Sequence, residues 1–89
     1  MEAAEIKAKI KRIISNVTSI DPGEIGDEAS FTEELGLDSL SLLEIGVDVD
    51  YEFQLGLPEE RMRGLDSVKQ TLALVEERLQ EKAGQAEVA

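Results

Sequence analysis

The stretch "VDVDYEF", from Val47 to Phe53, decides the fold because it fits two kinds of secondary structure. Apolar and polar residues alternate along it, which is typical of a half-buried strand, and Gly46 just before it suits a strand too. The sequence offers no second strand-like segment to pair with it, and a lone strand leaves its backbone groups without hydrogen-bond partners. We therefore predict a helix from about Ser39 to Phe53.

A helix over this range has two apolar faces, because successive residues lie about 100° apart around its axis. The face predicted to join the core carries Leu42, Ile45, Val49 and Phe53. The opposite face, called here the outer stripe, consists of Leu40, Leu43, Val47 and Tyr51, with Glu44 and Asp48 on one flank and Asp50 on the other. A small domain cannot easily bury both faces. The outer stripe is thus a candidate docking surface, apolar at its centre and acidic at its rim, unless it packs under another element or another copy of the chain.

Two further segments have the apolar spacing of amphipathic helices. The first places apolar side chains at Ile6, Ile10, Ile13, Ile14 and Val17, and the second at Leu65, Val68, Leu72, Val75 and Leu79. Pro58 is suited to begin a short helical turn through Arg63. Pro22 and Gly23 predict a long loop through Thr32, with Ile25 and Phe31 as its apolar anchors.

These elements predict an all-α domain of three longer helices and one short helix, with a long loop between the first and second helices. The 89 residues suit a single domain, which we place at residues 1–82, with a flexible C-terminal tail at residues 83–89. The sequence contains no apolar run long enough to span a membrane, and its charged N-terminus does not resemble a signal peptide. We expect a cytoplasmic monomer.

The residue types that are missing restrict the chemistry. The chain has no cysteine and no histidine, which removes thiolate nucleophiles and thiolate metal ligands, and leaves a serine without its usual neighbouring base. We therefore expect no enzymatic activity. A calcium loop at Asp48 and Asp50 fits badly, because Phe53 occupies the position where such a loop requires glycine, so no metal site is expected.

The formal net charge is -11, and between Ile13 and Glu60 there are thirteen acidic residues and no lysine or arginine. Nucleic acid is a poor partner for such a chain. Basic protein surfaces are suitable partners, since an acidic field speeds the encounter with them.

Two similar stretches each place a serine after an aspartate: "LGLDSL" from Leu35 to Leu40, and "RGLDSV" from Arg63 to Val68. Aspartate and serine are favoured caps at helix starts, and capping is a sufficient explanation for Ser67. Ser39 differs because it opens the helix that carries the outer stripe. A helix N-terminus also favours a phosphate ester, since its free N–H groups and dipole attract negative charge.

The segment "ELGLDSLSLLE", the acidic helix that it begins and "LGLPEE" resemble the acyl carrier protein family over nearly the whole domain. The resemblance implies a four-helix bundle in which Ser39, flanked by Asp38 and Leu40, receives the 4'-phosphopantetheine of coenzyme A from a phosphopantetheinyl transferase. The thiol of that arm would hold acyl groups as thioesters.

The resemblance also implies a role in fatty acid or polyketide-type biosynthesis, with the transferase and acyl-processing enzymes that have basic docking surfaces as partners. The docking residues it implies are Leu40, Leu43, Glu44, Val47, Asp48, Asp50 and Tyr51. An aminoacyl or peptidyl carrier would share Ser39, and an unmodified acidic helical adaptor would use the same surface without an arm. Gly46, inside the helix, and Arg61 and Arg63, beside an acidic surface, depart from the family pattern; we expect a pliable helix and an altered choice of partners.

Overall fold

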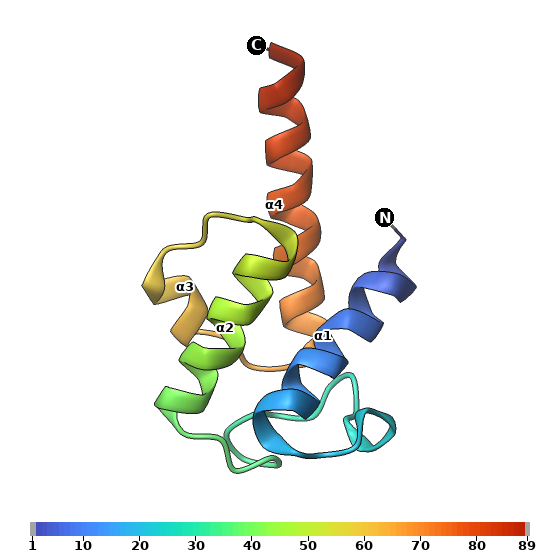
Figure 1. The fold of residues 1–89 in the computed structure, drawn as a ribbon, viewed down its shortest axis with the longest axis vertical. Helices are drawn as coiled ribbons and strands as arrows, with labels where there is room; N and C mark the ends of the chain where they lie inside the picture. Colours follow the sequence, from blue (N-terminus) through green and yellow to red (C-terminus); the bar gives the residue numbers. More distant parts are fainter. Residues whose placement is uncertain (1, 89) are drawn as a thin grey trace.

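The computed structural model describes the backbone of residues 2–88 and the side chains of residues 2–82. Its elements are α1 (Ala3–Thr18), the short 3-10 turn η1 (Pro22–Glu24), α2 (Ser39–Phe53), α3 (Glu59–Arg63) and α4 (Val68–Val88), and the described residues contain no strand (Figure 1). The all-α prediction is confirmed. The stretch "VDVDYEF" is helical, and α2 has the predicted bounds.

The helices enclose one apolar core. α1 packs against both α2 and α4, while α3 packs on α2 on the side away from α1 (Figure 1). The buried apolar residues are Ile6, Ile10, Ile13, Ile14, Ile25, Phe31, Leu42, Ile45, Val49, Phe53, Leu55, Leu57, Leu65, Val68, Leu74 and Val75. All four residues predicted for the inner face of α2 are among them. Burial of this apolar surface is the main favourable term in folding.

The apolar stripe predicted for the last helix packs against the core, but its members are not equally buried. Leu72 and Leu79 are only partly buried, whereas Thr71 and Leu74 are buried in addition to the residues predicted. Thr71 is tolerated in the core because its hydroxyl donates a hydrogen bond to the Ser67 carbonyl at 2.7 Å. A threonine whose hydroxyl is hydrogen-bonded to its own helix can therefore occupy a core position that an apolar pattern alone assigns to leucine.

The loop between α1 and α2 is held by buried side chains and by α4. Ile25 and Phe31 are buried, as predicted for loop anchors. The Phe31 N–H donates to the Asp66 carbonyl, and the Lys69 N–H donates to the Asp27 carbonyl, both at 2.8 Å. These contacts fix the path of the chain that leads to the start of α2.

Ion pairs connect the same loop to α1. The Asp27 carboxylate lies 2.7 Å from the Lys7 Nζ and 2.8 Å from the Lys11 Nζ. The hydrogen bond from Lys11, followed by that from Lys7, lowers the pKa of Asp27 from 3.8 to about 2. Two of the lysines of α1 are thus committed to the loop.

The end of α2 is held by cations from α4. The Leu55 carbonyl accepts hydrogen bonds from the Arg78 Nη2 at 2.9 Å and from its Nε at 3.3 Å, and the Gln54 carbonyl accepts one from the Lys82 Nζ. Carbonyls at a helix C-terminus lack partners within the helix and attract positive charge. The two side chains therefore fasten α4 to this end of α2.

The α4 backbone is helical through Val88, so it continues past the predicted boundary at residue 82, and its end projects beyond the other helices (Figure 1). The flexible tail at residues 83–89 stays a prediction; Ala89 and the side chains from Ala83 on lie outside the described part. Across residues 2–88, no helix combines the length and apolar character needed to cross a membrane.

Candidate functional site

Asp38 begins α2 as its N-cap. Its backbone is extended, its Oδ1 accepts a hydrogen bond from the Ser41 N–H at 2.9 Å, and its carbonyl accepts one from the Leu42 N–H at 3.0 Å. The backbone N–H of Ser41, helped by the Ser41 hydroxyl, lowers the pKa of Asp38 below its ordinary value. The carboxylate is therefore ionised and engaged in starting the helix at neutral pH.

Ser39 is then the first residue of α2 and does not cap it. Its side chain is exposed, and its hydroxyl has no hydrogen-bond partner among the side chains and backbone of residues 2–82. The first N–H groups of α2 have no acceptor within the helix, and those of Leu40 and Ser41 face the Asp38 carboxylate instead. This end of the helix attracts negative charge, and an exposed, uncommitted hydroxyl there fits attachment of a phosphate ester.

Ser67 is used differently. Its Oγ accepts a hydrogen bond from the Gln70 N–H at 3.1 Å, and the Gln70 Oε1 accepts one from the Asp66 N–H at 3.1 Å. This confirms the predicted cap at the start of α4. The aspartate caps the helix in one copy of "GLDS" and the serine in the other. A serine followed three residues later by glutamine is a capping signature, and it could have distinguished the two copies from sequence.

The outer stripe is largely uncovered. Leu40 is 63% exposed, Val47 47% and Tyr51 85%. Leu43 is half-buried. Of the four residues of the outer stripe, it lies nearest on the helical wheel to the buried Gly46. Among the described residues no element covers this face. Its docking role stays a prediction, with Leu43 at the edge of the surface rather than at its centre.

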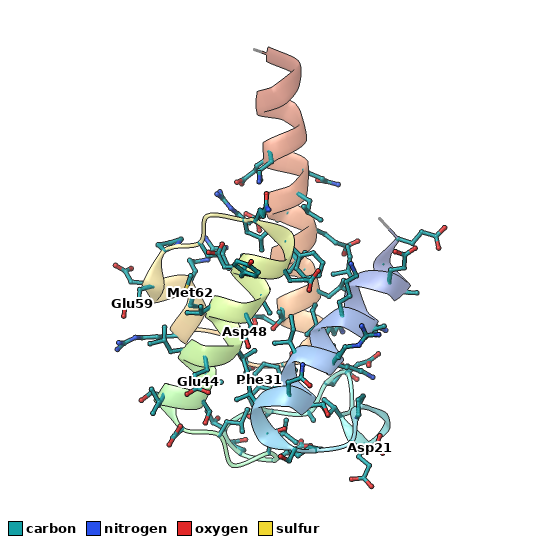
Figure 2. All side chains as sticks on the ribbon, viewed as in Figure 1. Asp21, Phe31, Glu44, Asp48, Glu59 and Met62 are labelled. Atoms are coloured by element: carbon teal, nitrogen blue, oxygen red, sulfur yellow. The ribbon has the colours of Figure 1, made fainter. Side chains whose placement is uncertain are left out.

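The carboxylates of the acidic rim are of two kinds: two are exposed, and one is hydrogen-bonded to the backbone. Glu44 and Asp48 are exposed along α2 (Figure 2). Asp50 is half-buried, and its Oδ1 accepts a hydrogen bond from the Leu57 N–H at 2.9 Å. Asp50 therefore holds the turn between α2 and α3, a task that local sequence did not indicate.

Gly46 is buried against α3. A Cβ at this position would lie 2.5 Å from the Met62 Cβ and 2.8 Å from the Met62 Cα, closer than packed atoms approach (Figure 2 labels Met62). Close packing against Met62 therefore explains why position 46 is a glycine, whereas the predicted local pliability of the helix does not explain it. Nearby, Arg63 pairs with Glu59 at 3.0 Å on α3, and Arg61 is exposed.

A family model described as "Phosphopantetheine attachment site" matches residues 8–75. The chain is 40% identical over 72 residues to the meromycolate extension acyl carrier protein of Mycobacterium tuberculosis strain H37Rv; this covers 81% of the chain but 63% of that protein. It is 36% identical over 85 residues to the protein of the same name from Mycolicibacterium smegmatis, covering 96% of the chain and 85% of the relative.

Two further similarities involve proteins named as acyl carrier proteins. The one from Rhodococcus erythropolis is 35% identical over 72 residues, which is 81% of the chain and 79% of that protein. The solved structure from Enterococcus faecalis superposes with a TM-score of 0.68 at 24% identity, covering 84% of the chain and 95% of that structure. At this identity the structural similarity supports the fold.

Proposed function

The chain belongs to the acyl carrier proteins of the phosphopantetheine-attachment family, and we propose that it is a non-catalytic carrier whose arm is attached at Ser39. Members of this family carry a covalent 4'-phosphopantetheine. The observation that carries the proposal is the arrangement at the start of α2. Asp38 takes over the capping of the helix, and the Ser39 hydroxyl is left exposed and without a partner.

The residues of this site fit the arm, and each has a separate task. When attached, the arm supplies a thiol on which acyl groups are held as thioesters. In the attachment step the Ser39 Oγ forms a bond to the β-phosphorus of coenzyme A, the bond between that phosphorus and the bridging oxygen breaks, and adenosine 3',5'-bisphosphate leaves. The positive end of the α2 helix dipole favours the resulting phosphodiester.

The hydroxyl proton of Ser39 must be taken up by another group. The chain has no histidine, and the Asp38 carboxylate is a poor base because its pKa is lowered by the hydrogen bonds that cap α2. The base therefore comes from the transferase. This chain contributes the nucleophile and its position, which agrees with a carrier that has no catalytic activity of its own.

The outer stripe is the docking surface in this proposal. Leu40, Val47 and Tyr51 offer apolar contact, while Glu44 and Asp48 attract a basic rim on the partner. The partners are the transferase and acyl-processing enzymes of fatty acid or polyketide-type biosynthesis. The names of the mycobacterial relatives, which refer to meromycolate extension, favour an acyl cargo over an aminoacyl one. A cytoplasmic location and a monomeric state remain predictions.

Intact-mass analysis tests the attachment. The chain is incubated with coenzyme A, magnesium and a broad-specificity phosphopantetheinyl transferase, and one arm is expected per chain. Ser39→Ala should abolish the mass shift, and Ser67→Ala should retain it if that variant folds. An unmodified wild-type chain would support the adaptor alternative, and modification of Ser39→Ala would place the arm elsewhere.

A further inference from the structure

Tyr51 places an aromatic ring in solvent at the far end of the outer stripe. The side chain is 85% exposed, and its hydroxyl has no hydrogen-bond partner among residues 2–82. A single exposed apolar residue needs no explanation, but Tyr51 continues the apolar line of Leu40 and Val47 along one face of α2. Packing within the described chain does not account for the ring.

Asp48 lies three residues before Tyr51, on the same face of α2 (Figure 2 labels Asp48). Residues three apart on a helix are neighbours, with about 5–6 Å between their Cβ atoms. A helical side chain leans toward the N-terminus of its helix, so the Tyr51 ring lies on the side of Asp48. The carboxylate and the ring therefore border the same small area of surface.

The carboxylate of Asp48 is exposed, and none of the cationic side chains of residues 2–82 forms an ion pair with it. Its two acidic neighbours on the last turns of α2 have partners. Asp50 accepts a hydrogen bond from the Leu57 N–H at 2.9 Å, and Glu52 lies 3.6 Å from the Lys9 Nζ. Asp48 can therefore pair with a cation that comes from another molecule.

An aromatic ring beside an unpaired carboxylate fits a guanidinium group. The planar guanidinium stacks on an aromatic face, while the N–H groups at its edge donate to a carboxylate. The ammonium group of lysine is a compact point charge that cannot stack in this way. A purely apolar partner would leave Asp48 without a counterion, and a second copy of this chain, with its net charge of -11, would be repelled.

We propose that Tyr51 and Asp48 together bind an arginine side chain of a partner enzyme and select arginine over lysine at this place. The inference rests on the proposed function, in which the outer stripe docks the partner. At about 1.5 Å per residue, Asp48 lies about 14 Å and Tyr51 about 18 Å along the helix axis from Ser39. The arginine is thus held away from the attachment point, where it contributes to binding of the carrier and not to the chemical step.

Two synthetic peptides of equal length and charge test the selection. Each forms an amphipathic helix with leucines along one face, to contact Leu40 and Val47, and with basic residues beside them, which are all arginine in one peptide and all lysine in the other. Binding to the full chain without an arm is followed by NMR through the Tyr51 ring and the Asp48 N–H at physiological ionic strength. The arginine peptide should bind about fivefold more tightly than the lysine peptide.

Substitutions separate the ring from mere apolar contact. Tyr51→Phe should keep the preference for arginine, because the ring remains, whereas Tyr51→Leu should abolish it although leucine is apolar. Asp48→Asn should weaken binding of the arginine peptide more than Glu77→Gln, which removes an equal charge at an exposed position of α4. All these positions are exposed, so the variants should fold like wild type, which circular dichroism checks.

Equal affinity of the two peptides for the wild-type chain would overturn the proposal, and so would a preference that survives in Tyr51→Leu or a failure of both peptides to bind. The peptides require no arm, so Ser39→Ala should bind them as the wild-type chain does. A chain that prefers the arginine peptide but takes up no arm contradicts the carrier function instead. A chain that takes up the arm and shows no preference contradicts only the arginine site.

Discussion

Gly46 of α2 and Met62 of α3 are in backbone contact, with only 2.5 Å between the Met62 Cβ and the place a Cβ on residue 46 would take. Because α3 has only five residues and packs on α2, this contact determines where α3 lies. A glycine inside a helix normally costs about 1 kcal/mol relative to alanine. The close approach of two helices explains why the cost is accepted here.

We predict that Gly46→Ala destabilises the fold. Overpacking typically costs about 1–3 kcal/mol, and here it falls in the upper part of that range, about 2–3 kcal/mol, because the Met62 backbone atoms cannot rotate away. The gain of about 1 kcal/mol in helix propensity offsets part of this cost, so we expect a net loss of about 1–2 kcal/mol. Urea unfolding measures it. Gly26→Ala is the control, since its Cβ would meet only ordinary contacts at 3.7 Å or more. A Gly46→Ala variant as stable as wild type would contradict the packing argument.

Substitutions on the two faces of α2 should differ strongly in how much stability they cost. Val47→Ser, on the 47% exposed residue, should cost under about 0.5 kcal/mol, whereas Phe53→Ala should cost about 3–5 kcal/mol because Phe53 is only 6% exposed. Thermal and urea unfolding of both variants provide the measurement. If Val47→Ser unfolds the protein and Phe53→Ala leaves it intact, the assignment of faces is wrong.

Charge reversal at the rim should slow association rather than damage the fold. Glu44→Lys places a cation among the acidic residues of α2, so the rate of arm attachment by the transferase should fall roughly several-fold at low salt, with a smaller deficit at high salt. Stopped-flow or initial-rate measurements across ionic strength test this. Glu77→Lys, an equal charge change at an exposed position of α4, is the matched control. Equal effects of the two variants would mean that net charge, and not this face, steers the encounter.

Self-repulsion among carboxylates should make stability depend on salt. With a net charge of -11, the melting temperature should rise with sodium chloride and rise further with magnesium at equal ionic strength. Scanning calorimetry against both salts measures the change. No response to either cation would show that the acidic residues do not limit stability.

Asp27 should contribute stability that is lost in acid. Its pKa is lowered to about 2 in the folded protein by Lys11 and Lys7, against 3.8 unpaired, so its contribution is complete above about pH 4 and disappears as the pH falls toward 2. Asp27→Asn should therefore lower the free energy of unfolding at neutral pH and approach wild type near pH 2. Urea titrations along a pH series compare the two, with Glu33→Gln on the same loop as control. If the difference in free energy of unfolding between wild type and Asp27→Asn does not shrink in acid, the ion pairs of Asp27 are not its cause.

Much of this fold was predictable because its signals are local. The bounds of α2 followed from a strand-like pattern that had no second strand to pair with, and the loop anchors Ile25 and Phe31 stood out as isolated apolar residues. The start of α2 at Ser39 also followed from the neighbouring residues. That Asp38 rather than Ser39 caps the helix needed the observed hydrogen bond to the Ser41 N–H.

The features that escaped prediction depend on contacts between distant segments. The fit of Gly46 to Met62 joins positions on two helices, and the bond from the Leu57 N–H to Asp50 crosses a turn whose path no pattern specifies. Thr71 is buried because its own helix satisfies it, which hydropathy does not show. In each case the sequence shows the residue type but not the group that the residue contacts.

The pairing of the α1 lysines has an electrical consequence for the whole molecule. Lys7 and Lys11 face Asp27, and Lys9 lies 3.6 Å from Glu52, while Glu44 and Asp48 have no ion-pair partner within residues 2–82. Three lysines of α1 are thus paired with carboxylates, while Glu44 and Asp48 on α2 keep their full negative charge. The field of a positively charged enzyme therefore attracts the face of the molecule that carries α2 before the surfaces meet. This attraction favours orientations in which α2, and with it Ser39, faces the enzyme, so that fewer collisions are unproductive.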